Sequence, residues 1–183
     1  MPFREHELPG SARPGYVAAM YRPAAGRFPT WIRHTMKVLV TGASGLVGNN
    51  VTRQLLDQGD AVRVLMRPES NRRSVEGLHV EIADGDVTDA ESLQAACRGV
   101  DAVVHAAGRI HFGWTGLDPM RTVNSGGARN IAEAANAAGA RLVHVSSVDA
   151  LGIRSPEQPA DEDTPPVGKL ECPYVVTKRE AEQ

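Results

Sequence analysis

The sequence predicts an α/β fold with a doubly wound parallel sheet. Three observations indicate it: strands and helices alternate from residue 36 onward, a glycine-rich turn follows the first strand, and the strands are short runs rich in aliphatic residues. Such alternation is typical of parallel sheets, because each parallel strand needs a crossover that is usually helical. Right-handed crossovers place ligand sites at the carboxyl ends of the strands.

Five strands are expected, in the spatial order 3-2-1-4-5 and with helices on both faces. Their ranges are 37–41, 61–66, 79–83, 101–107 and 141–147. The helix after the first strand has an apolar stripe with members four residues apart: Val47, Val51 and Leu55. Thr88 and Glu91 have the spacing of a capping box, which predicts a second helix starting there. A third helix is predicted over 120–138.

The first strand runs into TGASGLVG, in which Gly42, Gly45 and Gly48 are each separated by two residues. The first glycine permits a sharp turn, the second lets the backbone approach a pyrophosphate, and the third allows close packing of helix on sheet. Free N–H groups at the helix start attract phosphate. This context predicts a Rossmann-type dinucleotide site that includes Ser44 and Leu46, while a turn used only for packing is the alternative.

The end of the second strand distinguishes the two nicotinamide cofactors. An acidic residue there would bind the ribose 2′-hydroxyl of NAD, whereas an arginine suits the 2′-phosphate of NADP. The sequence has Arg67 at this place, followed by Arg72 and Arg73. NADP is therefore favoured over NAD, and the alternative is that Arg67 is a solvated loop charge.

Charge and cysteine content exclude several classes of function. Residues 1–35 have a net charge of +3 (five Arg, two Glu), and the remainder has −5 (15 basic, 20 acidic residues). An acidic main body without a basic cluster argues against nucleic acid as a partner, and no apolar run reaches the length of a membrane span. Two cysteines predict no disulfide framework and a cytoplasmic setting. Cys and His show no metal-ligand spacing, so no metal is expected.

Residues 1–35 contain five prolines, five arginines and three glycines, without helical or strand periodicity. The composition changes abruptly at Met36. We expect a disordered leader over 1–35, with Met36 as the functional start of the protein. A targeting peptide is the less favoured alternative, because acidic residues come early and no apolar signal core is present.

With TGASGLVG, GDVTD, VVHAAG, VSSVDALG and YVVTK in this order, the sequence resembles the extended short-chain dehydrogenase/reductases. These form the NAD-dependent epimerase/dehydratase superfamily, and the resemblance covers Met36 to the end of the chain. It implies a further set of cofactor contacts: Asp86 and Val87 after the third strand, Ala106, Ala107 and Gly108 after the fourth, and Asn124 on the next helix. Without the resemblance, Asp86 reads as a helix-entry residue.

The resemblance also implies a catalytic trio of Ser147, Tyr174 and Lys178, with Ser146 as the runner-up serine. Tyrosine has an unperturbed pKa near 10 and is a poor base at neutral pH, but a lysine cation nearby favours the phenolate. Lys178 would also bind the nicotinamide ribose. A tyrosine and a lysine four residues apart otherwise share one helix face by ordinary spacing.

The function implied is an NAD(P)-dependent oxidoreductase that moves hydride between the nicotinamide and a small carbonyl or alcohol substrate. VRVLMRP and VHAAGRI favour the dihydroflavonol-reductase and hydroxysteroid-dehydrogenase-like branch. Sugar-nucleotide epimerases and dehydratases are the runner-up enzymes, and a cofactor-sensing module or inactive fragment is the alternative from another class. A homodimer is left open for a full-length form.

In the family, the helix with the tyrosine and lysine leads to further strands and a smaller C-terminal domain that grips the substrate. This chain stops five residues after Lys178. We therefore expect residues 36–183 to be a truncated cofactor-binding domain, incomplete at the C-terminal edge of its sheet, and we expect little turnover from this chain alone.

Overall fold

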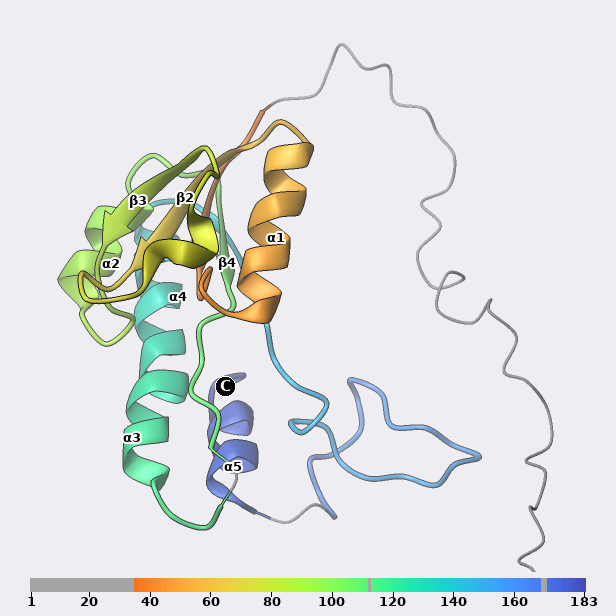
Figure 1. Ribbon diagram of the computed structural model, residues 1–183. Coiled ribbons are helices and arrows are strands. Elements are labelled where there is room, and N and C mark those ends of the chain that lie inside the picture. Colours follow the sequence, from red (N-terminus) through yellow and green to blue (C-terminus); the bar gives the residue numbers. More distant parts are fainter. Residues whose placement is uncertain (1–34, 112, 169–170) are drawn as a thin grey trace, which may run out of the picture. The chain divides into compact units, whose positions relative to one another are not determined.

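The computed structural model describes residues 35–111, 113–168 and 171–183, so the leader expected over 1–35 lies outside them except for its last residue. Five parallel strands form one sheet in the predicted order, β3-β2-β1-β4-β5 (Figure 1). In chain order the strands are β1 (Lys37–Thr41), β2 (Ala61–Met66), β3 (Val80–Asp84), β4 (Ala102–His105) and β5 (Arg141–His144). Among the described residues, β5 is an edge strand.

The last two strands are shorter than predicted, and the reason lies in β1. That strand stops at Thr41, where Gly42 turns the chain with a φ of 74°. β4 pairs with β1 only as far as His105, and β5 pairs with β4 only as far as His144. The small residues after β4 and the serines after β5 therefore leave the ladder and become loops at one edge of the sheet.

The helices cover both faces of the sheet (Figure 1). They are α1 (Leu46–Asp57), the 3₁₀ turn η2 (Arg72–Val75), α2 (Ala90–Cys97), α3 (Leu117–Arg121), the π-helical segment η3 (Thr122–Gly126), α4 (Gly127–Ala137) and α5 (Pro173–Glu180). Val51 and Leu55 of α1 pack on one face of the sheet, while Leu93 of α2 and Ile131 of α4 pack on the other. Each fully buried aliphatic side chain stabilises the fold by about 1.5–3 kcal/mol.

Two helix starts differ from the prediction. α2 is capped by Asp89, whose Oδ1 accepts a hydrogen bond from the Glu91 N–H, and not by Thr88. Thr88 does not cap the helix, because its N–H and its hydroxyl both donate to the Asp86 carboxylate. The third helix begins at Leu117, before the predicted start, because Pro119 fits the first turn of a helix.

A row of polar side chains crosses β1, β4 and the edge strand β5 on the face covered by α2 and α4. Thr41, His105 and His144 are register partners on β1, β4 and β5. Side chains alternate along a strand, so this row continues an apolar row two residues earlier on the same face: Leu39, Val103 and Leu142. Polar groups thus lie directly above the hydrophobic core.

The imidazole of His105 is fully buried and its Nδ1 lies 2.7 Å from the Thr41 Oγ1. The same hydroxyl accepts a hydrogen bond of 3.2 Å from the Ala107 N–H. The rings of His105 and His144 lie 5.2 Å apart at 31°. Burial, with the like charges that His144 and Lys178 would carry, lowers the pKa of His105 to about 3; burial and Lys178 also lower the pKa of His144.

These two histidines predict a loss of stability in mild acid. Unfolded histidine titrates near pH 6.5, whereas the folded His105 stays neutral down to about 3, so below pH 6.5 the unfolded chain binds more protons. The free energy of unfolding should be highest above pH 6.5 and should fall below it, by up to about 1.4 kcal/mol per pH unit for His105, and the lowered pKa of His144 acts in the same direction. Urea unfolding between about pH 7 and pH 5, above the range of most carboxyl groups, measures this slope.

Replacing His105 or His144 by Gln should reduce the slope, whatever it does to the stability itself. The variant used for comparison is His79→Gln, because His79 is exposed just before β3. A free energy of unfolding that stays level over this pH range in the unmodified chain would contradict the assignment.

Gly48 predicts a second stability effect. A Cβ on this residue would overlap the carbonyl oxygen of Gly42 and lie 2.6 Å from its carbon, whereas a Cβ on Gly45 would lie 3.4 Å from the same oxygen. Gly48→Ala should lower the free energy of unfolding by about 1–3 kcal/mol, although alanine is the better helix former. Gly45→Ala, the control in the same turn, should be less destabilising when both are measured by urea unfolding. Equal stabilities for the two variants would argue against this close packing.

Candidate active site

The turn between β1 and α1 brings three segments of backbone close together. A Cβ on Gly42 would lie 2.6 Å from the backbone of Ala106 and Ala107, so β1 and β4 approach each other here without a side chain between them. Gly45 is the N-cap of α1 and uses no side-chain cap, and the first turn of the helix contains no acidic residue. The positive end of the helix is therefore open to an anion.

A cavity of about 460 Å³ lies in front of this turn. Nine predicted cofactor residues line it: Gly42, Ser44, Gly45, Arg67, Asp86, Val87, Ala106, Ala107 and Gly108. Four others do not: Leu46, which is largely exposed, Gly48, which is buried under the turn, Asn124 and Lys178. The lining also includes residues that the motifs did not indicate: Thr41, Leu65, Met66, Ser70, Gly85, Arg109 and Val123. Most of these residues are sequence neighbours of a predicted residue at a strand end. Their place at the strand ends could therefore have indicated them from the sequence.

Asp86 is held by its own turn. Its Oδ1 accepts hydrogen bonds of 2.8 Å from both the N–H and the Oγ1 of Thr88, and its N–H donates to Ser92. The helix-entry role is thus real, but both side-chain bonds use one carboxylate oxygen. Asp86 still lines the cavity, so the two interpretations of this residue are compatible.

Arg67 lies at the mouth of the same cavity. Its side chain is exposed and lies 3.5 Å from Glu69, also exposed, so this ion pair is weak and can exchange for another anion. Arg72 pairs with Asp84 at 2.6 Å. The Arg67–Ser70 turn therefore presents a guanidinium to whatever occupies this end of the cavity.

The predicted catalytic pair lies on α5, which begins with Pro173 in its first turn. The buried Lys178 ammonium donates a 2.9 Å hydrogen bond to the Val145 carbonyl oxygen, just past the end of β5. Burial lowers the pKa of Lys178, and the carboxylate of Glu182 opposes that shift. This bond anchors the helix to the loop that carries Ser147 two residues later.

Ser147 contacts Asp149, two residues later in the chain. Its Oγ accepts the Asp149 N–H at 3.2 Å and lies 3.4 Å from the Asp149 Oδ2. Ser146, the runner-up serine, instead donates to Glu182 at the end of α5. The two serines thus differ in geometry: Ser146 donates to a surface carboxylate, whereas the hydrogen bonds of Ser147 within the described residues are to Asp149, two positions later.

Asn124 joins the cavity loop to α5 from within the π-helical segment. Its side chain accepts the Arg109 N–H at 2.7 Å and donates to the Arg109 carbonyl at 3.0 Å. It also donates to the Thr177 Oγ1 at 3.0 Å, and that hydroxyl in turn donates to the Tyr174 carbonyl. The buried asparagine therefore holds two parts of the site together through protein groups.

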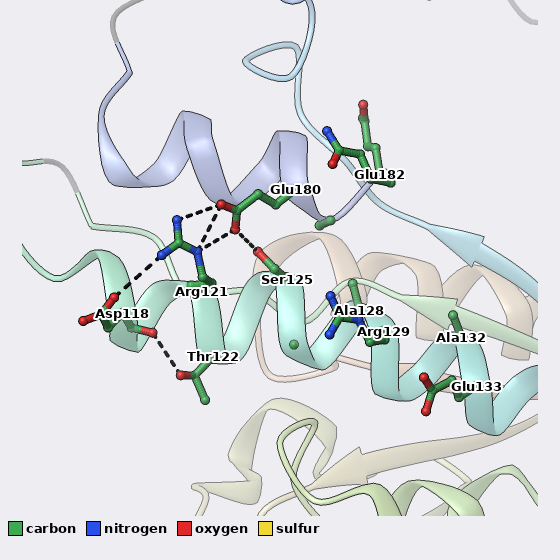
Figure 2. A pocket seen from close by; sticks show the side chains of 13 residues that line it. Asp118, Arg121, Thr122, Ser125, Ala128, Arg129, Ala132, Glu133, Glu180 and Glu182 are labelled. Atoms are coloured by element: carbon green, nitrogen blue, oxygen red, sulfur yellow. Dashed lines mark hydrogen bonds and ion pairs between the residues drawn. The ribbon is translucent and has the colours of Figure 1, made fainter.

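A charged contact also joins α5 to the α3–η3 segment, as Figure 2 shows. Arg121 binds both carboxylate oxygens of Glu180 at 2.8–3.0 Å, and the Ser125 hydroxyl donates to the same carboxylate at 2.9 Å. Arg121 thereby lowers the pKa of Glu180. A groove of about 960 Å³ runs along this contact, and none of the predicted site residues lines it. We place the candidate site at the smaller cavity for that reason.

Among the helices of the described residues, none is long and apolar enough to span a bilayer. The sequence matches the NAD dependent epimerase/dehydratase family over residues 38–183. A putative dihydroflavonol 4-reductase of Synechocystis sp. is 36% identical over 155 residues, covering 84% of this chain and 45% of that protein. The 3 beta-hydroxysteroid dehydrogenase type 7 of Homo sapiens is 33% identical, covering 79% and 42%.

Solved structures similar to this chain belong to the same group of enzymes. A short-chain dehydrogenase/reductase superfamily protein from Agrobacterium tumefaciens with bound NAD is 36% identical, with a TM-score of 0.67, and the alignment covers 80% of this chain and 43% of that one. The chain thus spans less than half the length of these relatives. The family match includes the glycine turn, the cavity and α5. The chain belongs to the NAD-dependent epimerase/dehydratase family.

Proposed function

We propose that the protein is an NAD(P)-dependent oxidoreductase that moves hydride between the nicotinamide and a carbonyl or alcohol substrate, with Ser147, Tyr174 and Lys178 at its catalytic site. The observation that carries this is the hydrogen bond from Lys178 to the Val145 carbonyl oxygen. It brings the tyrosine–lysine helix to the strand end that carries Ser147, at the same edge of the sheet as the cavity. The names of the dihydroflavonol and hydroxysteroid relatives favour an alcohol/ketone pair over a sugar nucleotide.

The cavity residues fit a dinucleotide. The glycine turn and the open end of α1 suit the pyrophosphate, and small residues after β4 leave room along the backbone. A bound nicotinamide would supply the hydride chemistry. The protein's own part is to place the substrate oxygen between the Ser147 hydroxyl and the Tyr174 phenol, and to exchange a proton at the phenol oxygen.

Lys178 lies one helical turn after Tyr174 on α5. Its ammonium donates a hydrogen bond to the Val145 carbonyl oxygen. Burial lowers the pKa of Lys178, and the Glu182 carboxylate opposes that shift. In the proposed site this lysine would hold the nicotinamide ribose beside the tyrosine.

Tyr174→Phe should lower kcat by about 10²–10⁴-fold, since it removes the proton-exchanging oxygen, and cofactor affinity should change little, because Tyr174 does not line the cavity. Because we expect little turnover from this chain alone, kcat is measured in a form extended by a relative's C-terminal domain. Steady-state oxidation of secondary alcohols, followed through reduced nicotinamide, gives kcat, and calorimetry measures binding. Val176→Ala, two residues away on the same helix, serves as the control. Turnover in Tyr174→Phe at the unmodified rate would disprove the assignment.

Arg67 predicts the choice of cofactor. With a guanidinium instead of a carboxylate at this end of the cavity, NADP should bind at least as tightly as NAD. Arg67→Ala should weaken NADP by about tenfold, which corresponds to one charge-assisted contact, and should leave NAD nearly unchanged. Titration of both cofactors by calorimetry measures this, with Arg53→Ala on the exposed side of α1 as a charge-matched control. A preference for NAD that persists in Arg67→Ala would contradict the assignment.

A further inference from the structure

Arg109 lines the cavity, and the proposed function gives it no role. It lies on the loop after β4, which also supplies small residues to the lining. The residue is exposed, and among the described residues its guanidinium has no hydrogen-bond or ion-pair partner. A second arginine of the lining, Arg67, instead pairs with Glu69. The cavity therefore has an unpaired cation at its β4 side.

The backbone of Arg109 is fixed, although its side chain has no partner. The Oδ1 of Asn124 accepts the Arg109 N–H at 2.7 Å, and the Nδ2 of Asn124 donates to the Arg109 carbonyl oxygen at 3.0 Å. Asn124 itself is buried. A fixed backbone reduces the entropy that is lost when the side chain binds a ligand. Because these bonds use main-chain atoms of Arg109 alone, replacing its side chain should leave them intact.

The strand order places Arg109 at the catalytic end of the cavity. Along the edge of the sheet, Arg67 follows β2, the glycine turn follows β1, Arg109 follows β4 and Ser147 follows β5. Arg109 therefore leaves the sheet between the glycine turn and the proposed catalytic serine. Asn124 supports this placement, because it also donates to Thr177, on the helix with the proposed tyrosine and lysine.

The phosphates of the dinucleotide have other partners in the proposed site. The glycine turn and the open end of α1 suit the diphosphate, and Arg67 suits the 2′-phosphate. Asp86, the acidic residue of the lining, follows β3 at the opposite end from Arg109. The lining beside Arg109 is otherwise small or apolar: Ala106, Ala107, Gly108 and Val123. A guanidinium in such surroundings makes its strongest contacts with a carboxylate or a phosphate.

We infer that Arg109 binds an acidic group of the substrate, so that the substrate class is alcohols or ketones that carry a carboxylate or a phosphate. The inference rests on the proposed function. Arg109 would hold the acidic group, while the reacting oxygen lies between the Ser147 hydroxyl and the Tyr174 phenol. Contacts at two points of the substrate fix its orientation, which is the geometric requirement for efficient transfer.

The test compares acids with neutral molecules of the same shape. The pairs are lactate and β-hydroxybutyrate, each with its methyl ester, and glycerol phosphate with glycerol. NMR titration of the NADP-loaded chain, observed at the amides of the loop after β4, measures these affinities without turnover. Each acid should bind at least about tenfold more tightly than its neutral partner, which corresponds to one charge-assisted contact.

Three variants assign that preference to one side chain. Arg109→Ala should reduce the affinity for each acid to that of its neutral partner, and Arg109→Lys should retain part of the preference. Arg129→Ala removes an exposed cation of α4 that lines the other groove, and it should bind as the unmodified chain does. Equal affinity for acids and neutral molecules in the unmodified chain would overturn the inference, as would a preference that survives in Arg109→Ala.

Cofactor binding distinguishes the other source of an anionic group. Calorimetry should find the affinities for NAD and NADP unchanged in Arg109→Ala. If both fall while the preference for acids persists, Arg109 contacts the diphosphate and the substrate assignment is wrong.

Turnover in the form extended by a relative's C-terminal domain gives a last readout. Arg109→Ala should raise KM for the hydroxy acids about tenfold, with a smaller effect on kcat and none on the esters. If that form oxidises no alcohol, the proposed function fails, and the NMR titration still decides whether Arg109 binds acids.

Discussion

The fold depends on the close approach of backbone at the turn after β1. Gly42 lies against the backbone of Ala106 and Ala107, and Gly48 lies against Gly42, at distances that leave no room for a Cβ. These contacts fix α1 on the sheet and set how far β1 and β4 can run together. Because both strands stop here, the loops of the candidate site all start from one edge of the sheet.

Above that edge, the protein buries groups that would be costly to bury alone. Charged and polar groups in a medium of low dielectric constant need partners or change their protonation. Lys178 donates to the Val145 carbonyl oxygen, and Glu182 opposes the lowering of its pKa by burial. Burial lowers the pKa of His105 to about 3, and its ring lies against the Thr41 hydroxyl. The buried lysine is thus supported by a carbonyl and a carboxylate, and the buried histidine by a hydroxyl.

Sequence reasoning predicted the strand order, the glycine turn and nine residues of the cavity lining, because each depends on local periodicity or on the ends of strands. It did not predict the row from Thr41 to His144. These residues lie 39 or more positions apart for each neighbouring pair, and only strand register brings them together. Likewise, the hydrogen bonds of Asn124 to Arg109 and Thr177 were not predicted, because no local pattern indicates them.

The same asparagine connects the two halves of the site. One amide holds the loop after β4, which lines the cavity, and the helix with Tyr174 and Lys178. Since the amide has no spare donor for a third partner, a shift of either element must break a buried hydrogen bond or move the other element with it. A ligand that reorders the cavity loop would therefore also move α5, and the Arg121–Glu180 contact, on the same face of α5 as Thr177, would resist that movement.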